Sequence, residues 1–220
     1  MNLPINQITE YPIIFSSESV KAILDGRKTQ TRRIIKLPKE PKEGCGKANW
    51  DLATKPQWAK DNEFAFIDMA FPTDTYPTMA RCSYGKVGDL LWVKEGWACA
   101  GDIRMQARGA VVYKADYGDT GKFKFKSPIH MPKWAARIWL EITGIKVETL
   151  QEITIEEIWA EGRSPSLSDD EDYSAGYEWF ADLWDSINAK RGFGWESNPW
   201  VWVIEFKKSA ESAKSAINND

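Results

Sequence analysis

The sequence predicts a mainly β domain of the mixed α+β class, a small β-barrel with flanking helices and two long insertions. Short strands separated by turn signals recur along the chain with few helices between them, a pattern typical of a small barrel rather than of alternating β-α-β units. A length of 220 residues fits one such domain. With 43% apolar and 28% charged residues, the chain also has enough apolar material for a core.

The first predicted elements are a strand, a helix and a second strand. Residues 11–15 form the first strand, and the Ser16-Ser17 pair offers an N-cap to the helix. The apolar positions of this helix share one face: Val20, Ile23 and Leu24. Gly26 ends the helix, and residues 29–36, rich in Thr and Ile, form the next strand.

Further strands are predicted at residues 90–93, 109–113, 136–147 and 200–207. A helix is expected at residues 153–162, because Thr154 and Glu157 make a capping box. A second helix at residues 173–189 places apolar side chains at helical spacing: Tyr177, Phe180, Trp184 and Ile187.

These elements predict a single domain over residues 1–208, with a flexible tail at residues 209–220. The two insertions are expected at about residues 37–80, where prolines interrupt any sustained period, and at about residues 163–198.

Several classes of protein do not fit the composition. Three cysteines at wide spacings favour reduced thiols over a disulfide framework, and they lack the close pairs of a zinc site. His130, the single histidine, argues against a Ser-His-Asp or Cys-His hydrolase. We therefore expect chemistry based on Lys, Thr, Glu and Arg, with no cofactor and no metal.

The chain also gives no sign of a membrane partner. Its longest apolar runs are far shorter than the ~20 residues of a membrane-spanning helix, and residues 1–10 lack the pattern of a secretory signal. We expect a cytoplasmic protein.

The charges are unevenly distributed although the net charge is only -3, from 29 basic and 32 acidic residues. One acid-free stretch contains five basic residues: Arg27, Lys28, Arg32, Arg33 and Lys36. Such a patch on an acidic protein suits a small anionic or nucleotide ligand better than a long duplex.

The passage LDGRKTQTRR at residues 24–33 resembles the signature of the ASCH domain, a PUA-like barrel family. Further blocks look like those of longer ASCH proteins from phage and prophage genomes, in the same order: YGKVGD at 84–89 with LWVKE at 91–95, IHMPKWA at 129–135, and NPWVWVIEF at 198–206. The resemblance covers the barrel and implies a PUA-like fold.

The same resemblance implies an activity and a set of catalytic residues. One small bacterial ASCH enzyme removes acetyl from N4-acetylcytidine, and the family's proposed catalytic Lys, Thr and Glu match Lys28, Thr31 and Glu161. The implied function is metal-independent hydrolysis of an N4-acylated cytidine or a similar modified nucleoside. Two alternatives remain open: a non-catalytic RNA or modified-base binding protein, and a ribonuclease using Lys28 and Arg32 on the phosphorane with Glu161 or His130 as base.

Amide hydrolysis needs an activated nucleophile, a stabilised oxyanion and a proton for the leaving amine. Lys28, if desolvated among Arg27 and Arg32, would have a lowered pKa and serve as base. It can converge with Thr31 only from the turn before the strand, because side chains alternate within a strand. Glu161 lies at a helix end that disfavours an ionised carboxylate, which suits a general acid; the alternative is a solvated surface residue.

The candidate substrate-binding residues are Arg27, Arg32, Arg33, Glu95 and His130. The Arg32-Arg33 pair fits either a phosphate clamp or a salt-bridged strand edge. Glu95 follows a buried strand, where it would face the barrel mouth or partner an arginine. His130 would line the pocket or bond the backbone at a turn.

Overall fold

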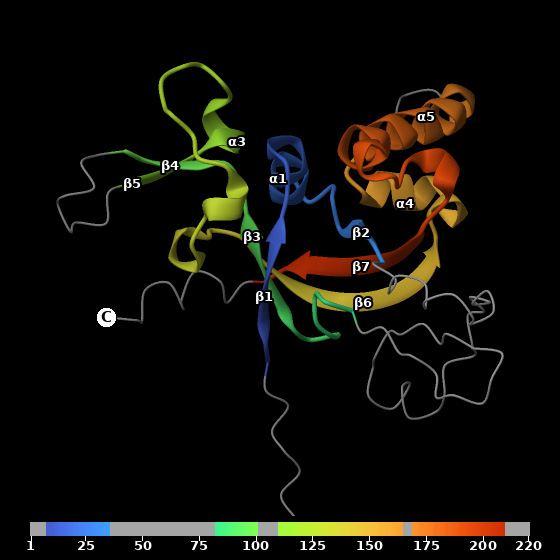
Figure 1. Cartoon of the computed structure of the whole chain (residues 1–220), viewed down its shortest axis with the longest axis horizontal. Helices are drawn as coiled ribbons and strands as arrows, with labels where there is room; N and C mark the ends of the chain where they lie inside the picture. The colour runs from blue at the N-terminus through green and yellow to red at the C-terminus, as the bar shows by residue number, and fades with distance from the viewer. Residues whose placement is uncertain (1–7, 36–81, 101–109, 165–168, 210–220) are drawn as a thin grey trace, which may run out of the picture.

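The computed structural model of the chain describes residues 8–35, 82–100, 110–164 and 169–209 (Figure 1). These residues form one five-stranded sheet, one two-stranded sheet and a few helices. The prediction of a β-rich α+β fold is therefore confirmed. Residues 37–80, where the first insertion is predicted, and all of the predicted tail after Ser209 lie outside the described residues.

The larger sheet has the strand order β1-β3-β6-β7-β2. Its strands are β1 (Glu10–Ile14), β2 (Gln30–Ile34), β3 (Leu90–Lys94), β6 (Trp139–Thr149) and β7 (Trp200–Lys208). Strands β1 and β3 are parallel, and the other pairs are antiparallel. The smaller sheet pairs β4 (Trp97–Ala100) with β5 (Ala110–Tyr113).

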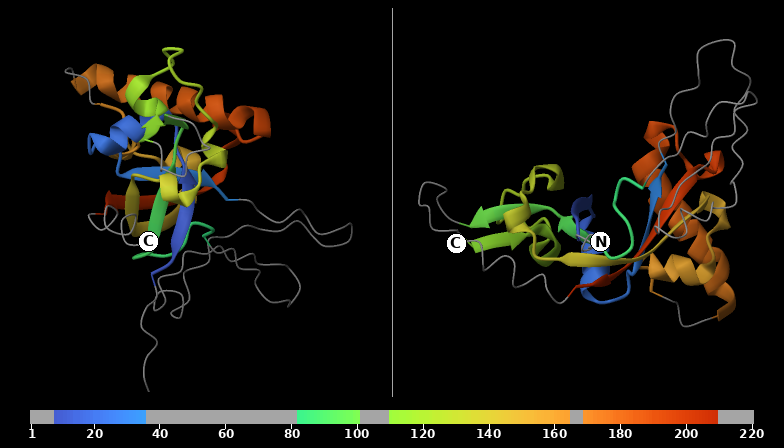
Figure 2. Two further views of the ribbon diagram at one scale, coloured as in Figure 1. Left: turned by 90° about the vertical axis from the view of Figure 1, so that its left-hand side faces the viewer. Right: turned by 90° about the horizontal axis from the view of Figure 1, so that it is seen from below.

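The described helices are α1 (Ser17–Leu24), α3 (Lys114–Tyr117), α4 (Ile155–Ala160) and α5 (Asp169–Asn188). Short 3-10 turns join them at Pro128–His130, Lys133–Ala135, Leu150–Glu152, Ala189–Arg191 and Trp195–Ser197. Helix α1 lies between the lobe of β4, β5 and α3 and the pair formed by α4 and α5 (Figures 1 and 2). None of the helices in the described ranges is long and apolar enough to cross a membrane.

Strand β7 organises the core because both of its faces are buried. Val201 and Val203 lie in the cluster beneath α4 and α5. The alternating residues Trp202, Ile204 and Phe206 lie in the larger cluster, which also contains Val20 and Ile23 of α1. Successive side chains of a strand point to opposite faces, so the apolar run of β7 separates two hydrophobic layers.

The two edge strands of the larger sheet, β1 and β2, are connected through side-chain contacts. These two strands are not paired with each other in the described ladders, and α1 connects them along the chain. The Arg33 Nη2 donates to the carbonyl of Ile14 at 2.9 Å. Phe15, the residue after β1, is buried, and its ring centroid lies 6.1 Å from that of Phe206 in β7.

Several elements differ from their predicted bounds. Strand β6 begins at Trp139 rather than at residue 136, because the Ala136 N–H closes a 3-10 turn onto the carbonyl of Lys133 at 2.9 Å. Strand β4 and helix α3 were not predicted, because both are only four residues long and have no sustained period.

The predicted apolar faces of α1 and α5 were each wrong at one residue. The buried stripe of α5 runs from Phe180 through Trp184 to Asn188, whose Nδ2 donates to the carbonyl of Trp184 at 3.2 Å. Its four-residue steps turn Ile187 outward, and that side chain is 56% exposed. Leu24 at the end of α1 is exposed as well.

Paired truncations test this packing. We expect Ile204→Ala, in the fully buried middle of β7, to lower the free energy of unfolding by about 2–5 kcal/mol. Ile187→Ala removes the same atoms from an exposed position, so its effect should stay within about 0.5 kcal/mol. Urea unfolding of both variants measures the difference, and equal losses would contradict the assignment of the two faces.

Candidate functional site

Lys28 lies between the turn that ends α1 and the start of β2, and it forms an isolated antiparallel bridge with Glu161, the C-cap residue of α4. The adjacent Thr29 N–H donates to the carbonyl of Ala160 at 2.9 Å. The start of β2 is thus joined to the end of α4, although these segments are far apart in the sequence. Lys28 is outside the strand, as its convergence with Thr31 requires.

Gly162 makes this close approach possible. Its φ is +109°, and an added Cβ would lie 2.9 Å from the Cβ of Ala22 and 3.2 Å from the Cβ of Lys28. Arg27 fixes the same turn, since its Nη1 donates to the Gly162 carbonyl and its Nη2 contacts the Asp25 carboxylate at 3.0 Å. Arg27 therefore holds the backbone beside the site.

The side chains of Lys28 and Glu161 form a buried pair. The Lys28 Nζ donates to Glu161 Oε2 at 2.5 Å and to the Glu161 carbonyl at 2.7 Å. The two residues are only 5% and 6% exposed, which excludes the solvated alternative for Glu161. Burial lowers the pKa of Lys28 despite the opposing charge and hydrogen bond of Glu161, and the charges of Arg33 and Arg32 lower it further.

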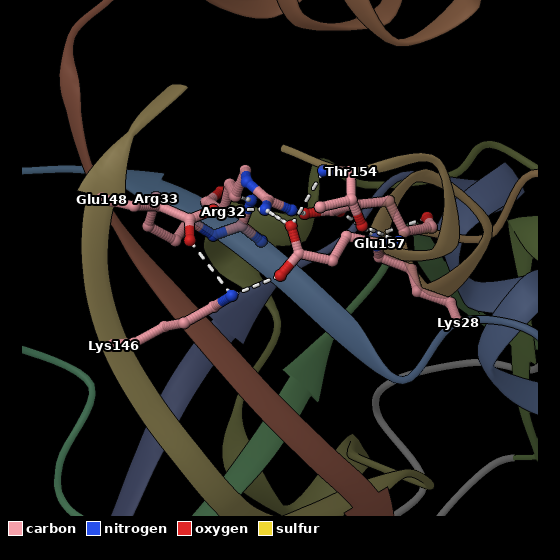
Figure 3. A network of polar contacts seen from close by, with 8 residues as sticks. Lys28, Arg32, Arg33, Lys146, Glu148, Thr154 and Glu157 are labelled. Carbon is pink, nitrogen blue, oxygen red and sulfur yellow. Dashed lines mark hydrogen bonds and ion pairs between the residues drawn. The ribbon is translucent and has the colours of Figure 1, made fainter. Parts of the chain in front are cut away.

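Arg32 extends the pair into a network of carboxylates (Figure 3). Its Nη2 contacts Glu157 Oε2 at 2.6 Å and also donates to Glu148, while its Nη1 lies 3.5 Å from Glu161 Oε1. Lys146 bridges the same two partners, with its Nζ 3.0 Å from Glu148 Oε2 and in hydrogen-bond contact with Glu157. The Arg32 side chain is almost completely buried.

Some buried polar atoms at this site have hydrogen-bonding capacity that no described residue satisfies. They are Glu161 Oε1 and the Nε and Nη1 of Arg32. Buried charged atoms without hydrogen bonds are unusual and costly. Arg32 Nη1 and Glu161 Oε1 lie 3.5 Å apart as an ion pair, so part of this unused capacity faces across the pair itself, and Arg32 Nε is the remaining donor.

Thr31 lies on the other face of β2 from Arg32. It is buried and pairs with Ile204 of the core beneath α1. Phe15 belongs to that core, and its ring centroid is 5.8 Å from Lys28 Nζ. Thr31 and Lys28 are thus both on the Phe15 side, although no hydrogen bond joins the Thr31 hydroxyl to Lys28 or Glu161 in the described part of the chain.

The two neighbouring arginines do not form a common clamp. Arg33 lies on the Phe15 side, with its Cζ 5.1 Å from that ring centroid, whereas Arg32 faces Phe180 of α5. Of the two predicted roles, the salt-bridged one describes Arg32.

Glu95 and His130 lie apart from the Lys28 pair. Glu95 is buried and accepts from Arg137 Nε at 2.8 Å and Arg137 Nη2 at 3.0 Å, and the same guanidinium also binds Asp116. Glu95 thus partners an arginine. His130 is exposed in a 3-10 turn, and its backbone N–H donates to the Ser127 carbonyl at 3.1 Å. Within the described ranges, neither Glu95 nor His130 contacts Lys28 or Glu161.

Sequence reasoning missed Lys146 and Glu148 and found only one of the two roles of Glu157. The capping box is confirmed, since the Thr154 N–H donates to Glu157 Oε2 at 3.1 Å, but the same oxygen also binds Arg32. The sequence contained a pattern that could have indicated Lys146 and Glu148, because the two residues are two positions apart in β6 and therefore share a face.

The thiol of Cys82 and the possible metal ligands are two further kinds of reactive group in the described ranges. Burial raises the pKa of Cys82 to about 11, which leaves a protonated, poorly nucleophilic thiol at neutral pH. Among the residues that the structure describes, no group of three His, Cys, Asp or Glu side chains is arranged to hold a metal ion.

Comparison with known proteins gives one likeness to a solved structure. No protein-family model matches the chain, and no curated protein matches it. The chain is similar to an ASCH domain. That domain is from Lactobacillus crispatus JV V101; the TM-score is 0.37 and the identity 11%, over 91% of this chain and 79% of that one.

The buried amine predicts a pH dependence of stability. Between the lowered pKa of folded Lys28 and the ordinary value of 10.5, the unfolded chain binds more protons. The free energy of unfolding should therefore rise with pH in that window, by at most about 1.4 kcal/mol per pH unit. Denaturant unfolding of wild type and Lys28→Met/Glu161→Gln at several alkaline pH values measures this; parallel pH curves would contradict the assignment.

Proposed function

We propose that the protein is a metal-independent amidohydrolase that removes the acyl group from an N4-acylated cytidine or a similar modified nucleoside. The observation that carries the proposal is the buried Lys28–Glu161 pair, joined at 2.5 Å beside polar atoms whose hydrogen-bonding capacity is unused. The resemblance of residues 24–33 to the ASCH signature supports it independently, because that passage contains Lys28 and Thr31.

The pair can supply both a base and an acid. Burial penalises the charged form of the Lys28 amine and lowers its pKa, and the proton is proposed to pass along the 2.5 Å hydrogen bond to Glu161. The resulting neutral amine accepts a proton, and the resulting carboxylic acid donates one. A buried Lys–Glu pair thus provides two catalytic groups from one proton transfer.

The reaction can be written so that protons balance. Lys28 takes a proton from water, or from Thr31 as the nucleophile, while a C–O bond forms at the acyl carbon. Arg32 Nε is a buried donor for the developing oxyanion when water attacks; it does not serve an attack by Thr31, which lies on the other face of β2. Glu161 protonates N4 as the C–N bond breaks, and a proton passing from Lys28 to Glu161 resets the pair. Attack by Thr31 requires a second step in which water releases the acyl group.

A non-catalytic reader of modified bases would use the same donors and acceptor without the proton transfers. A ribonuclease with His130 as base has less support, because His130 is exposed and does not contact the pair within the described residues.

Substitution of the three proposed catalytic residues is the direct test. We expect Lys28→Met, Thr31→Ala and Glu161→Gln each to lower acetate release from N4-acetylcytidine by roughly 100- to 10,000-fold, the usual contribution of a general acid or base. Because the three act as a unit, the triple variant should be scarcely slower than the slowest single variant.

The matched control is Glu156→Gln, which removes an exposed carboxylate from the same helix and should leave the rate unchanged. Thermal melts are needed because Lys28 and Glu161 are buried, and removing one partner of a buried ion pair can cost about 3–5 kcal/mol. Rates are compared well below the melting range of each variant. A wild-type protein that binds the nucleoside but releases no acetate would support the reader instead.

Chelation tests the metal-independent chemistry. Each carboxylate of the network already faces a cation, Glu161 that of Lys28 and Glu157 that of Lys146, so we expect full activity after dialysis against EDTA. Loss of acetate release in EDTA, with recovery on adding Zn²⁺ or Mg²⁺, would contradict this mechanism.

A further inference from the structure

A second basic stretch lies in the lobe of β4, β5 and α3. Residues 120–140 contain no Asp or Glu, and residues 122–126 alternate lysine with phenylalanine as KFKFK. The stretch also contains Lys133 and Trp134. It belongs to neither the Lys28 pair nor its carboxylate network.

The alternation separates charged from aromatic side chains at the surface. Lys122, Lys124 and Lys126 are exposed, whereas Phe123 and Phe125 are half-buried. Phe123 packs against Phe125, with ring centroids 5.9 Å apart, and edge-on against Tyr117 at 5.1 Å. The three lysines thus lie beside the rings of Tyr117, Phe123 and Phe125, which contact one another.

This basic stretch also contacts Trp97 and contains Trp134. Lys126 forms a backbone bridge with Trp97, and its Nζ lies 5.0 Å from the centre of the Trp97 ring. Trp134 meets that ring edge-on, with centroids 5.9 Å apart, and is 57% exposed. A large aromatic face is therefore presented to solvent beside the lysines.

Among the described residues, the acids around Lys122, Lys124 and Lys126 do not neutralise these lysines. The nearby carboxylates already have partners: Asp119 with Lys114, Asp116 with Arg137, and Glu10 with Lys133. In the described part of the chain, Lys122, Lys124 and Lys126 have no ion pair. Three positive charges are therefore available on one face of a protein with a net charge of -3.

We propose that this strip, formed by Lys122, Lys124 and Lys126 with the aromatic residues Tyr117, Phe123, Phe125 and Trp134, binds single-stranded nucleic acid. Lysines that follow a phosphate backbone, interleaved with rings on which bases stack, are the combination that single strands require. An anionic membrane fits less well, because Phe123 and Phe125 are half-buried against neighbouring rings and so offer little apolar surface for insertion.

The strip is separate from the proposed hydrolytic site, and a series of contacts connects the two parts of the fold. Lys94 donates from Nζ to the Ile129 carbonyl at 2.6 Å, and its own carbonyl accepts from the Phe15 N–H at 3.1 Å. Phe15 in turn lies beside Lys28. Binding to the strip needs no hydrolysis, so the two proposals succeed or fail on different measurements.

The test is fluorescence anisotropy of the full chain with labelled oligouridylate, oligothymidylate and a duplex of equal length, over a range of KCl concentrations. We expect both single strands to bind more tightly than the duplex. The variant Lys122→Ala/Lys124→Ala/Lys126→Ala should bind at least tenfold more weakly, and its log-log salt slope should be shallower by about 2, at about 0.7 per phosphate contact. Trp134→Ala should weaken binding about 5- to 150-fold, as for one stacked base, with an unchanged slope.

The matched control is Lys190→Ala/Lys207→Ala/Lys208→Ala, which removes the same charge from exposed positions elsewhere and should bind like wild type. Equal losses in the two triple variants would overturn the proposal, as would no binding by wild type. Binding to phosphatidylserine vesicles that depends on the strip, without oligonucleotide binding, would identify a membrane site instead. A preference for oligouridylate would identify RNA as the ligand. Equal binding of oligouridylate and oligothymidylate would mean that the strip binds single-stranded RNA and DNA alike.

Discussion

The bridge between Lys28 and Glu161 is the contact that places the candidate site. It joins the turn before β2 to the end of α4, so that an amine and a carboxylate from distant parts of the sequence meet in a buried position. Gly162 permits the approach, because a side chain there would collide with α1 and with Lys28 itself. The cost of burying the two charges is offset only while both partners are present.

Stability and chemistry are linked through the same carboxylates. Glu157 caps α4 and also holds Arg32, and Arg32 in turn faces Glu161. A substitution at any of these positions would therefore disturb the helix, the guanidinium and the proposed acid together. Second contacts of this kind are what keep catalytic side chains in one geometry.

Local patterns were readable from the sequence, and long-range burial was not. The capping box of Thr154 and Glu157 and the strand predicted at residues 200–207 depend on neighbours within a few residues, and the structure confirms both. Glu161 was ambiguous because the sequence next to it is acidic and helical, as on a solvated surface. Its burial arises from β2, more than a hundred residues earlier.

The charges of the site argue for an uncharged ligand group. Lys28, Arg32 and Lys146 face Glu148, Glu157 and Glu161, so the cations and carboxylates of the network balance. A phosphate at this network would find no net positive charge among these six residues, because Glu148, Glu157 and Glu161 offset Lys28, Arg32 and Lys146. A base carrying an amide would instead find donors and an acceptor. Lys122, Lys124 and Lys126, which have no ion pair among the described residues, belong to the lobe of β4, β5 and α3 instead, so the two proposed sites differ in charge.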